Sequence, residues 1–155
     1  MLNVNLYPSP VEMIEYTINP SIHKDFTSEH NIRSVIHPNY ADLRREIMVF
    51  NEEIKWSGMW TFEDAKQRLS DGWIFVCLFL DHQVKGWVWF EPKTKTLRNL
   101  YVNSKYRNKG YGSELVKKLC MECHKMGVKN MTSYVDEWNE SSHKVFLNTN
   151  WVSEI

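Results

Sequence analysis

Apolar positions in the middle of the chain form three short, nearly continuous runs. Residues 73–80 make the first run, and residues 84–90 make the second after the short connection at residues 81–83. Two apolar runs with so short a polar connection predict an antiparallel hairpin. A turn at residues 91–95 then precedes a third run at residues 97–102. The pattern therefore predicts three consecutive antiparallel strands.

Helical spacing appears on both sides of these strands. Leu43, Ile47, Phe50 and Ile54 recur at intervals of three or four, which predicts a helix over residues 39–55. Further helices are predicted at residues 61–69, 111–126 and 141–148, and further strands at residues 11–18, 129–136 and 151–155. Residues 20–38 are polar and mixed, and no element is predicted there.

The helix at residues 111–126 joins the strands at residues 97–102 and 129–136. Such a crossover favours parallel pairing of the two strands. The order of elements predicts an α+β fold of three layers, with antiparallel strands first, then a parallel pair, and helices on both faces of a mixed central sheet. No repeat or linker divides the chain, so residues 1–155 are expected to form a single domain.

A basic stretch with two glycines joins the strand at residues 97–102 to the helix that follows. It reads Arg-Asn-Lys-Gly-Tyr-Gly-Ser over residues 107–113, and Lys105 adds a further positive charge. Glycine lets the backbone approach a ligand closely, and the N–H groups of a first helical turn lack partners within the helix. The stretch therefore predicts a phosphate or pyrophosphate site at the start of the helix.

Composition narrows the function classes. The chain has 19 basic and 19 acidic residues and a pI near 7.0, which argues against a general nucleic-acid binder. No apolar run approaches the roughly 18 residues of a membrane span. The N-terminus shows no basic region followed by an apolar core, and the three cysteines indicate reduced thiols, so we expect a cytoplasmic protein.

Two further patterns suggest metal or haem chemistry. Cys120, Cys123 and His124 match the Cys-x-x-Cys-His pattern of covalent haem attachment, but both cysteines fall on the apolar face of a predicted helix. His23, His30 and His37 recur every seven residues without a matching cysteine or carboxylate pattern. We therefore favour buried thiols and incidental histidines, and no metal site is expected.

Four tryptophans allow two interpretations. Trp56 and Trp60 bracket a glycine between two predicted helices, and Trp87 and Trp89 share one face of a predicted strand. They either line a substrate cleft, where they could contact an apolar or cationic group, or fill the core.

The glycine loop and its surroundings resemble the GNAT superfamily of acyl-CoA-dependent N-acyltransferases. The family's acyl-CoA loop reads Gln/Arg-x-x-Gly-x-Gly/Ala, and residues 107–112 match it in full. Leu-Tyr-Val at residues 100–102 stands before the loop at the family's usual spacing. Asn139 and Phe146 stand where the family has an Asn near CoA and an aromatic residue. The resemblance is clearest over residues 73–151.

This resemblance implies a GNAT-like sheet whose parallel strands splay around the cofactor. It also implies an acetyltransferase that moves the acetyl group of acetyl-CoA to an amine by direct attack, the amine belonging to a small molecule or a protein. The residues that the resemblance implies for acetyl-CoA binding are Leu100, Tyr101, Val102, Arg107, Asn108, Lys109, Gly110, Tyr111, Gly112, Ser113, Asn139 and Phe146.

The chain departs from the family at Phe146, where a Tyr commonly protonates the departing CoA thiolate. Phe146 has no proton to give. Tyr101, Tyr134, His143 or water are the alternative donors, or the thiolate leaves unassisted, which a thiol pKa near ~8.5 permits. The carboxylates near the predicted cleft are Glu91, Asp136 and Glu137, of which Asp136 is favoured as the general base. The catalytic candidates are therefore Asp136, Tyr134 and Glu91.

The C-terminal end is short for this family. Only four residues follow Trp151, whereas most family members carry two further strands that often wall the acceptor site. This leaves two alternatives, a more open cleft or an edge that a homodimer or another partner completes. The short C-terminal end and Phe146 together also allow the alternative that the protein is a non-catalytic GNAT-fold module, which holds CoA or a protein partner.

Overall fold

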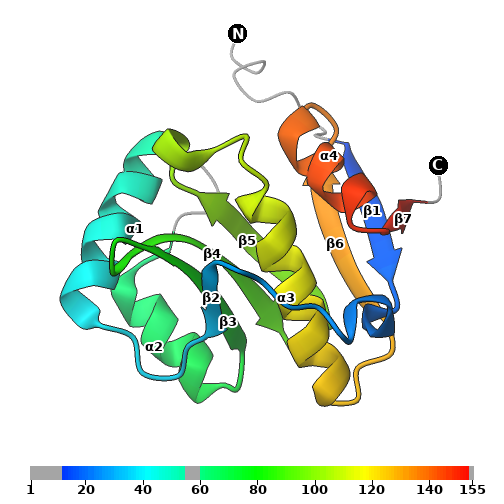
Figure 1. The fold of residues 1–155 in the computed structure, drawn as a ribbon, viewed down its shortest axis with the longest axis horizontal. Helices are drawn as coiled ribbons and strands as arrows, with labels where there is room; N and C mark the ends of the chain where they lie inside the picture. The colour runs from blue at the N-terminus through cyan, green and yellow to red at the C-terminus, as the bar shows by residue number, and fades with distance from the viewer. Residues whose placement is uncertain (1–11, 55–59, 154–155) are drawn as a thin grey trace, which may run out of the picture.

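A computed structural model describes residues 12–54 and 60–153. Within them, seven strands form one sheet in the order β2-β3-β4-β5-β6-β1-β7 (Figure 1). The strands are β1 (Met13–Ile18), β2 (Asn31–Ser34), β3 (Ile74–Leu80), β4 (Gln83–Glu91), β5 (Thr96–Val102), β6 (Met131–Asp136) and β7 (Val152–Ser153). The α-helices are α1 (Tyr40–Ile54), α2 (Phe62–Ser70), α3 (Tyr111–Lys125) and α4 (Glu140–Asn148), with short 3₁₀ helices η2 (Pro20–His23) and η3 (Ser104–Tyr106). Among the described helices, none is long and apolar enough to cross a bilayer.

Helices cover both faces of the sheet, as the sequence predicts. In Figure 1, α3 and α4 lie on the near face, whereas α1 and α2 lie on the other. Alternation along β3 supplies both cores: Val76 and Leu78 join the cluster that contains α3, and Phe75 and Cys77 join the cluster that contains α1. Among the seven described strands, only β5 and β6 pair in parallel, and the other pairings are antiparallel. The predicted mixed α+β sheet is confirmed.

Three of the four singled-out tryptophans fill the core under α1 and α2. Trp60, Trp87 and Trp89 are each at most 1% exposed. The rings of Trp60 and Trp87 meet edge to face at 4.8 Å, and Phe75 stacks on Trp89 at 3.9 Å. The cleft-lining interpretation is wrong for these three: alternation along β4 points Trp87 and Trp89 into the α1 side of the sheet, and Trp60, just before α2, packs in the same cluster. Trp56 lies outside the described residues.

The three cysteines are buried free thiols. Cys120 and Cys123 lie within α3 and are inaccessible to solvent, which excludes the haem-attachment interpretation of their spacing. Burial raises the pKa of the Cys120 thiol to about 12 and also raises the pKa of Cys77 and Cys123.

We expect all three thiols of the native protein to resist Ellman's reagent at pH 8. Protonated, buried thiols are poor nucleophiles, so colour should develop only as the protein unfolds. In guanidinium chloride, the absorbance of the released thionitrobenzoate should correspond to three reacted thiols per chain. Fast reaction of one or more thiols without denaturant would contradict the buried placement.

The N-terminal strand lies where the sequence pattern did not predict it. The sequence predicts a strand at residues 11–18 without its neighbours; β1 lies between β6 and β7 and runs antiparallel to both. Tyr16 is opposite Ser133 of β6 and Ser153 of β7. The edge beside β3 is instead β2, in the segment where no element was predicted. The sheet therefore continues past β6 through a strand from the start of the same chain.

Candidate active site

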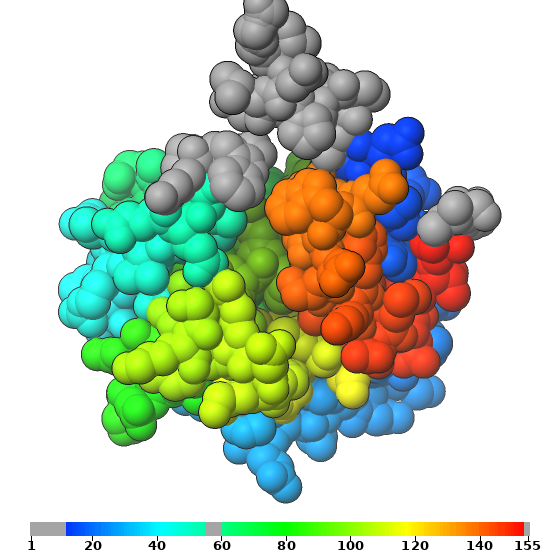
Figure 2. All heavy atoms as spheres, turned by 90° about the horizontal axis from the view of Figure 1, so that it is seen from above, coloured from blue at the N-terminus to red at the C-terminus, as the bar shows by residue number. Residues whose placement is uncertain are grey.

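The parallel strands β5 and β6 separate almost at once. They pair only at Thr96 and Thr132, next to a hydrogen bond from the Thr132 N–H to the Lys95 carbonyl at 3.0 Å. Beyond this point, the edge of β5 that faces β6 pairs with no strand among the described residues. Figure 2 shows a hollow at this end of the molecule, between α1, the loop after β5 and the segment that leads into α4. The predicted splay of the parallel pair is confirmed.

A bulge near the end of β5 directs its backbone toward this gap. The register with β4 shifts between Trp87 and Trp89, opposite Asn99, whose φ is 56°. Past the bulge, the Asn103 N–H donates to the Lys85 carbonyl of β4 at 2.7 Å. Because successive N–H groups of a strand point to opposite edges, the N–H of Val102 points away from β4 and into the gap.

The loop after β5 ends at an uncapped helix start. Gly110 is the N-cap of α3 with φ 85°, and no side chain caps the helix. The first i to i−4 bond is donated by Glu114, so the N–H groups of Gly110, Tyr111, Gly112 and Ser113 have no partner within the helix. A Cβ built on Gly110 would have no atom within 4 Å, so space is open beside these donors. This geometry fits a phosphate or pyrophosphate group.

Of the basic side chains in the loop, Arg107 is bonded to the rest of the protein, whereas Lys105 and Lys109 are exposed. Arg107 turns back: its Nε donates to the Val102 carbonyl at 2.8 Å, and its guanidinium forms an ion pair with Glu53 of α1. Arg107 therefore holds the loop against α1 and the end of β5. Lys105 and Lys109 are exposed beside the helix start, where they add positive charge.

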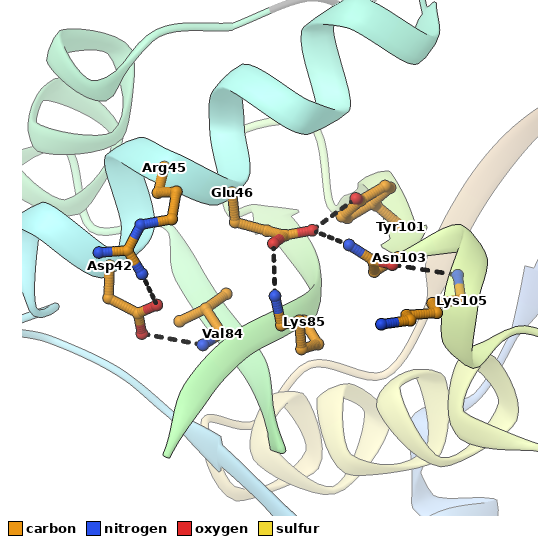
Figure 3. A network of polar contacts seen from close by, with 8 residues as sticks. All are labelled: Asp42, Arg45, Glu46, Val84, Lys85, Tyr101, Asn103 and Lys105. Carbon is orange, nitrogen blue, oxygen red and sulfur yellow. Dashed lines mark hydrogen bonds and ion pairs between the residues drawn. The ribbon is translucent and has the colours of Figure 1, made fainter. Parts of the chain in front are cut away.

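A buried carboxylate lies directly under the end of β5, and the sequence pattern did not single it out. Glu46 of α1 is 2% exposed. It accepts hydrogen bonds from the Tyr101 hydroxyl at 2.6 Å and the Asn103 amide at 2.7 Å, and it pairs with the Lys85 ammonium at 3.3 Å. Figure 3 shows the three donors converging on the two carboxylate oxygens. Burial, together with the hydrogen bond to Glu46, raises the pKa of Tyr101, so this phenol holds its proton.

The three catalytic candidates lie in different places. Asp136 ends β6 and is partly buried at the open end of the gap. Glu91 is opposite Thr96 at the start of β5 and pairs with Arg98 at 2.9 Å. Six residues of strand, about 20 Å, separate that end of β5 from Val102, so Glu91 is removed from the candidate bases.

Neither Tyr134 nor His143 is placed to donate a proton to a group in the gap. Tyr134 is half exposed on the face of β6 away from α4, and a hydrogen bond to Glu15 raises its pKa. His143 has its Nε2 3.0 Å from the Asp136 carbonyl, which can only accept, so Nε2 carries a proton. In neutral His143, Nδ1 then accepts from the Tyr16 hydroxyl at 2.7 Å. These contacts tie His143 to the backbone at the end of β6 and to β1, so neither ring nitrogen is free to act as an acid.

Asn139 and Phe146 have structural contacts of their own. Asn139 is the N-cap of α4, and its side-chain oxygen accepts from the Ser142 N–H at 3.2 Å. Phe146 is 2% exposed and stacks on Tyr16 with a centroid distance of 5.4 Å. Trp151 meets the Phe146 ring edge to face at 5.0 Å. Phe146 therefore belongs to the core formed by α3, α4 and β1.

The evenly spaced histidines do not come together. His23 donates from Nε2 to the Thr149 carbonyl at 2.7 Å, whereas His30 pairs with Glu114 of α3 at 2.8 Å and His37 is exposed in a loop. The three side chains cannot align on one helix, because η2 ends at His23 and the segment continues into the strand β2. No cluster of three or more metal-ligating side chains occurs among residues 12–54 and 60–153.

Solved structures share this fold at low sequence identity. A Drosophila protein matches with a TM-score of 0.69 and 13% identity, over 92% of this chain and 48% of its own. A GNAT-family acetyltransferase from Streptococcus pneumoniae matches with a TM-score of 0.68 and 19% identity, over 81% and 86% of the two chains. A ribosomal-protein-alanine N-acetyltransferase from Brucella melitensis matches with a TM-score of 0.63 and 21% identity, over 77% and 82%. The chain spans about half the length of the Drosophila protein.

Comparison with sequence families gives a direct assignment. No curated protein sequence matches the chain significantly. The family model of the GNAT acetyltransferases matches residues 37–149, which include α1, the loop after β5 and α4 but leave out β1. This match spans well over half of the chain, and it includes the glycine loop that forms the uncapped start of α3. The chain therefore belongs to the GNAT acetyltransferase family.

Proposed function

We propose that this protein transfers an acetyl group from acetyl-CoA to an amine by direct attack of the amine on the thioester. The observation that carries the proposal is the uncapped start of α3, with Gly110 at φ 85°, beside the gap between β5 and β6. Four unpaired N–H groups and the positive end of the helix dipole converge there, as a pyrophosphate requires. Membership of the GNAT family supports acetyl-CoA as the donor.

In this proposal, different groups of the chain bind the pyrophosphate, bind the acyl end of the donor and accept the proton of the amine. The N–H groups of residues 110–113 bind the pyrophosphate, and Lys109 adds charge at their side. The Val102 N–H donates to the acyl end of the donor in the gap. Asp136, at the open end of the same gap, takes the proton that the attacking amine loses. Alignment of amine and thioester supplies most of the rate enhancement in such a reaction.

The CoA thiolate leaves without a protein acid in this proposal. Tyr101 is hydrogen-bonded to Glu46 on the α1 side, Tyr134 lies on the outer face of β6, and His143 is engaged with Tyr16. A thiol pKa near ~8.5 makes unassisted departure feasible near neutral pH.

The proposal covers two classes of acceptor, an amine of a small molecule and an amine of a protein. The Brucella melitensis neighbour acts, by its name, on an alanine of a ribosomal protein. A second candidate function is a non-catalytic module that holds CoA, and the burial of Phe146 in place of a proton donor favours it.

Isothermal titration calorimetry with acetyl-CoA and CoA tests the proposal. We expect saturable binding of one acetyl-CoA per chain, and native mass spectrometry of the purified protein should detect the same complex. Absence of binding at millimolar acetyl-CoA would overturn both the enzyme and the CoA-holding module. Binding without acetyl transfer to any member of an amine and peptide panel would favour the module.

A further inference from the structure

The Glu46 carboxylate is unusual because it is charged, almost fully buried and bonded to three donors at once. Burial of a carboxylate costs free energy unless hydrogen bonds or an opposite charge compensate it. A purely apolar helix face would pack α1 on the sheet without this cost. The carboxylate therefore does something that packing alone does not provide.

Its partners flank the residue whose backbone faces the gap. Tyr101 and Asn103 stand on either side of Val102, and both donate to the same oxygen, Oε2. Lys85 pairs with the other oxygen, and its own carbonyl accepts from the Asn103 N–H. Figure 3 shows these groups gathered at the point where β5 passes into the loop. Glu46 thus holds the chain on both sides of Val102.

Besides Glu46, this end of β5 is held by its pairing with β4 and by the hydrogen bond from Arg107 to the Val102 carbonyl. Beyond Thr96, β5 has no pairing with β6, and the bulge at Asn99 interrupts its register with β4. Close packing fixes the remaining side, since a Cβ on Gly86 would lie 2.8 Å from the Tyr101 carbonyl oxygen. A strand end with one free edge needs a side-chain anchor to keep a backbone donor in a fixed direction.

We propose that Glu46 is a positioning residue that fixes the Val102 N–H toward the thioester carbonyl of acetyl-CoA. Glu46 does not touch the donor, because its two oxygens are occupied by Tyr101, Asn103 and Lys85. It acts through the strand, by preventing the end of β5 from rotating. This inference rests on the proposed function, since it concerns the same donor in the same gap.

The chain offers a matched control on the same helix. Asp42, one turn earlier on α1, also anchors β4, where its Oδ2 accepts from the Val84 N–H at 2.8 Å (Figure 3). Asp42→Asn removes one charge and keeps an oxygen that can accept this bond. Glu46→Gln removes the same charge and keeps one oxygen, but its amide hydrogens then face either Lys85 or the Tyr101 and Asn103 donors. Tyr101→Phe removes one of these donors and keeps the ring in the core.

The test is infrared difference spectroscopy of [1-¹³C]acetyl-CoA bound to each variant, with CoA affinity measured by calorimetry. A hydrogen bond to the thioester carbonyl lowers its stretching frequency, so the wild-type complex should show a shift from free acetyl-CoA. Glu46→Gln and Tyr101→Phe should each lose part of the shift, while CoA affinity stays unchanged. Asp42→Asn should retain the full shift.

The outcomes separate this inference from the proposed function. Failure of the wild-type protein to bind acetyl-CoA would overturn the proposed function. Binding with no shift in the wild type, or with a full shift in Glu46→Gln, would overturn only the positioning role. An equal loss of shift in Asp42→Asn would do the same, because it would indicate a general effect of charge on α1. If Glu46→Gln fails to fold, Tyr101→Phe decides, and a full shift in that variant overturns the inference.

Discussion

Gly110→Glu is expected to lower the affinity for acetyl-CoA by about 100-fold or more. Gly110 is the N-cap of α3, and the space beside its Cβ position is open. A glutamate there places a carboxylate where the pyrophosphate is proposed to bind, so two anions compete for the same N–H groups. Isothermal titration calorimetry of the variant with acetyl-CoA measures the loss.

The same helix provides the control for backbone strain. Gly127, just past the C-terminal end of α3, has φ 84° and no atom within 4 Å of a Cβ, almost the same geometry as Gly110. Any non-glycine residue at either position pays about 1–2 kcal/mol for a left-handed backbone. Gly127→Glu should lose at least as much stability as Gly110→Glu, because a carboxylate is unfavourable at the negative end of the helix dipole, and should still bind acetyl-CoA with wild-type affinity. Equal affinities of the two variants would show that the phosphates bind elsewhere.

The glycine loop was predictable because its chemistry is local. A strand, a basic loop and a helix start follow one another within residues 97–126, and positive φ at Gly110 is a requirement that the residue type itself reveals. The crossover between β5 and β6 was predictable for the same reason, since one helix joins two apolar runs.

Glu46 was missed although the sequence held a signal for it. It lies within the apolar stripe of α1, three residues after Leu43 and four before Phe50. A carboxylate on a face that is otherwise apolar must have partners. Those partners, Tyr101 and Asn103, are more than fifty residues away. Only the folded sheet brings them to α1.

The edge strand β2 was missed for a different reason. It has four residues, of which only Ile32 is buried, and its other side chains are polar and exposed. Such short, polar strands are typical of sheet edges and carry almost no alternation. The position of β1 was equally hidden, because local pattern predicts a strand but not its neighbours. Pairing with β6 and β7 depends on contacts across more than a hundred residues.

Tyr16→Ala is expected to lower the free energy of unfolding by about 3–5 kcal/mol, as for other large aromatic truncations in a core. Tyr16 is 3% exposed, stacks on Phe146 and joins His143 through its hydroxyl. Urea denaturation followed by tryptophan fluorescence measures the change.

Two further variants on β1 show which part of the Tyr16→Ala stability loss comes from the ring. One removes only the hydroxyl, and the other truncates a different side chain of the same strand. Tyr16→Phe keeps the stack on Phe146 and leaves the His143 Nδ1 without its donor, so the loss should be about 1 kcal/mol. Met13→Ala, on the opposite and exposed face of β1, should change stability by no more than about 0.5 kcal/mol. A Tyr16→Ala loss as small as that of Met13→Ala would mean that β1 does not lie between β6 and β7. A large loss would mean that α4, which follows the end of β6, depends on a strand that the family model leaves out.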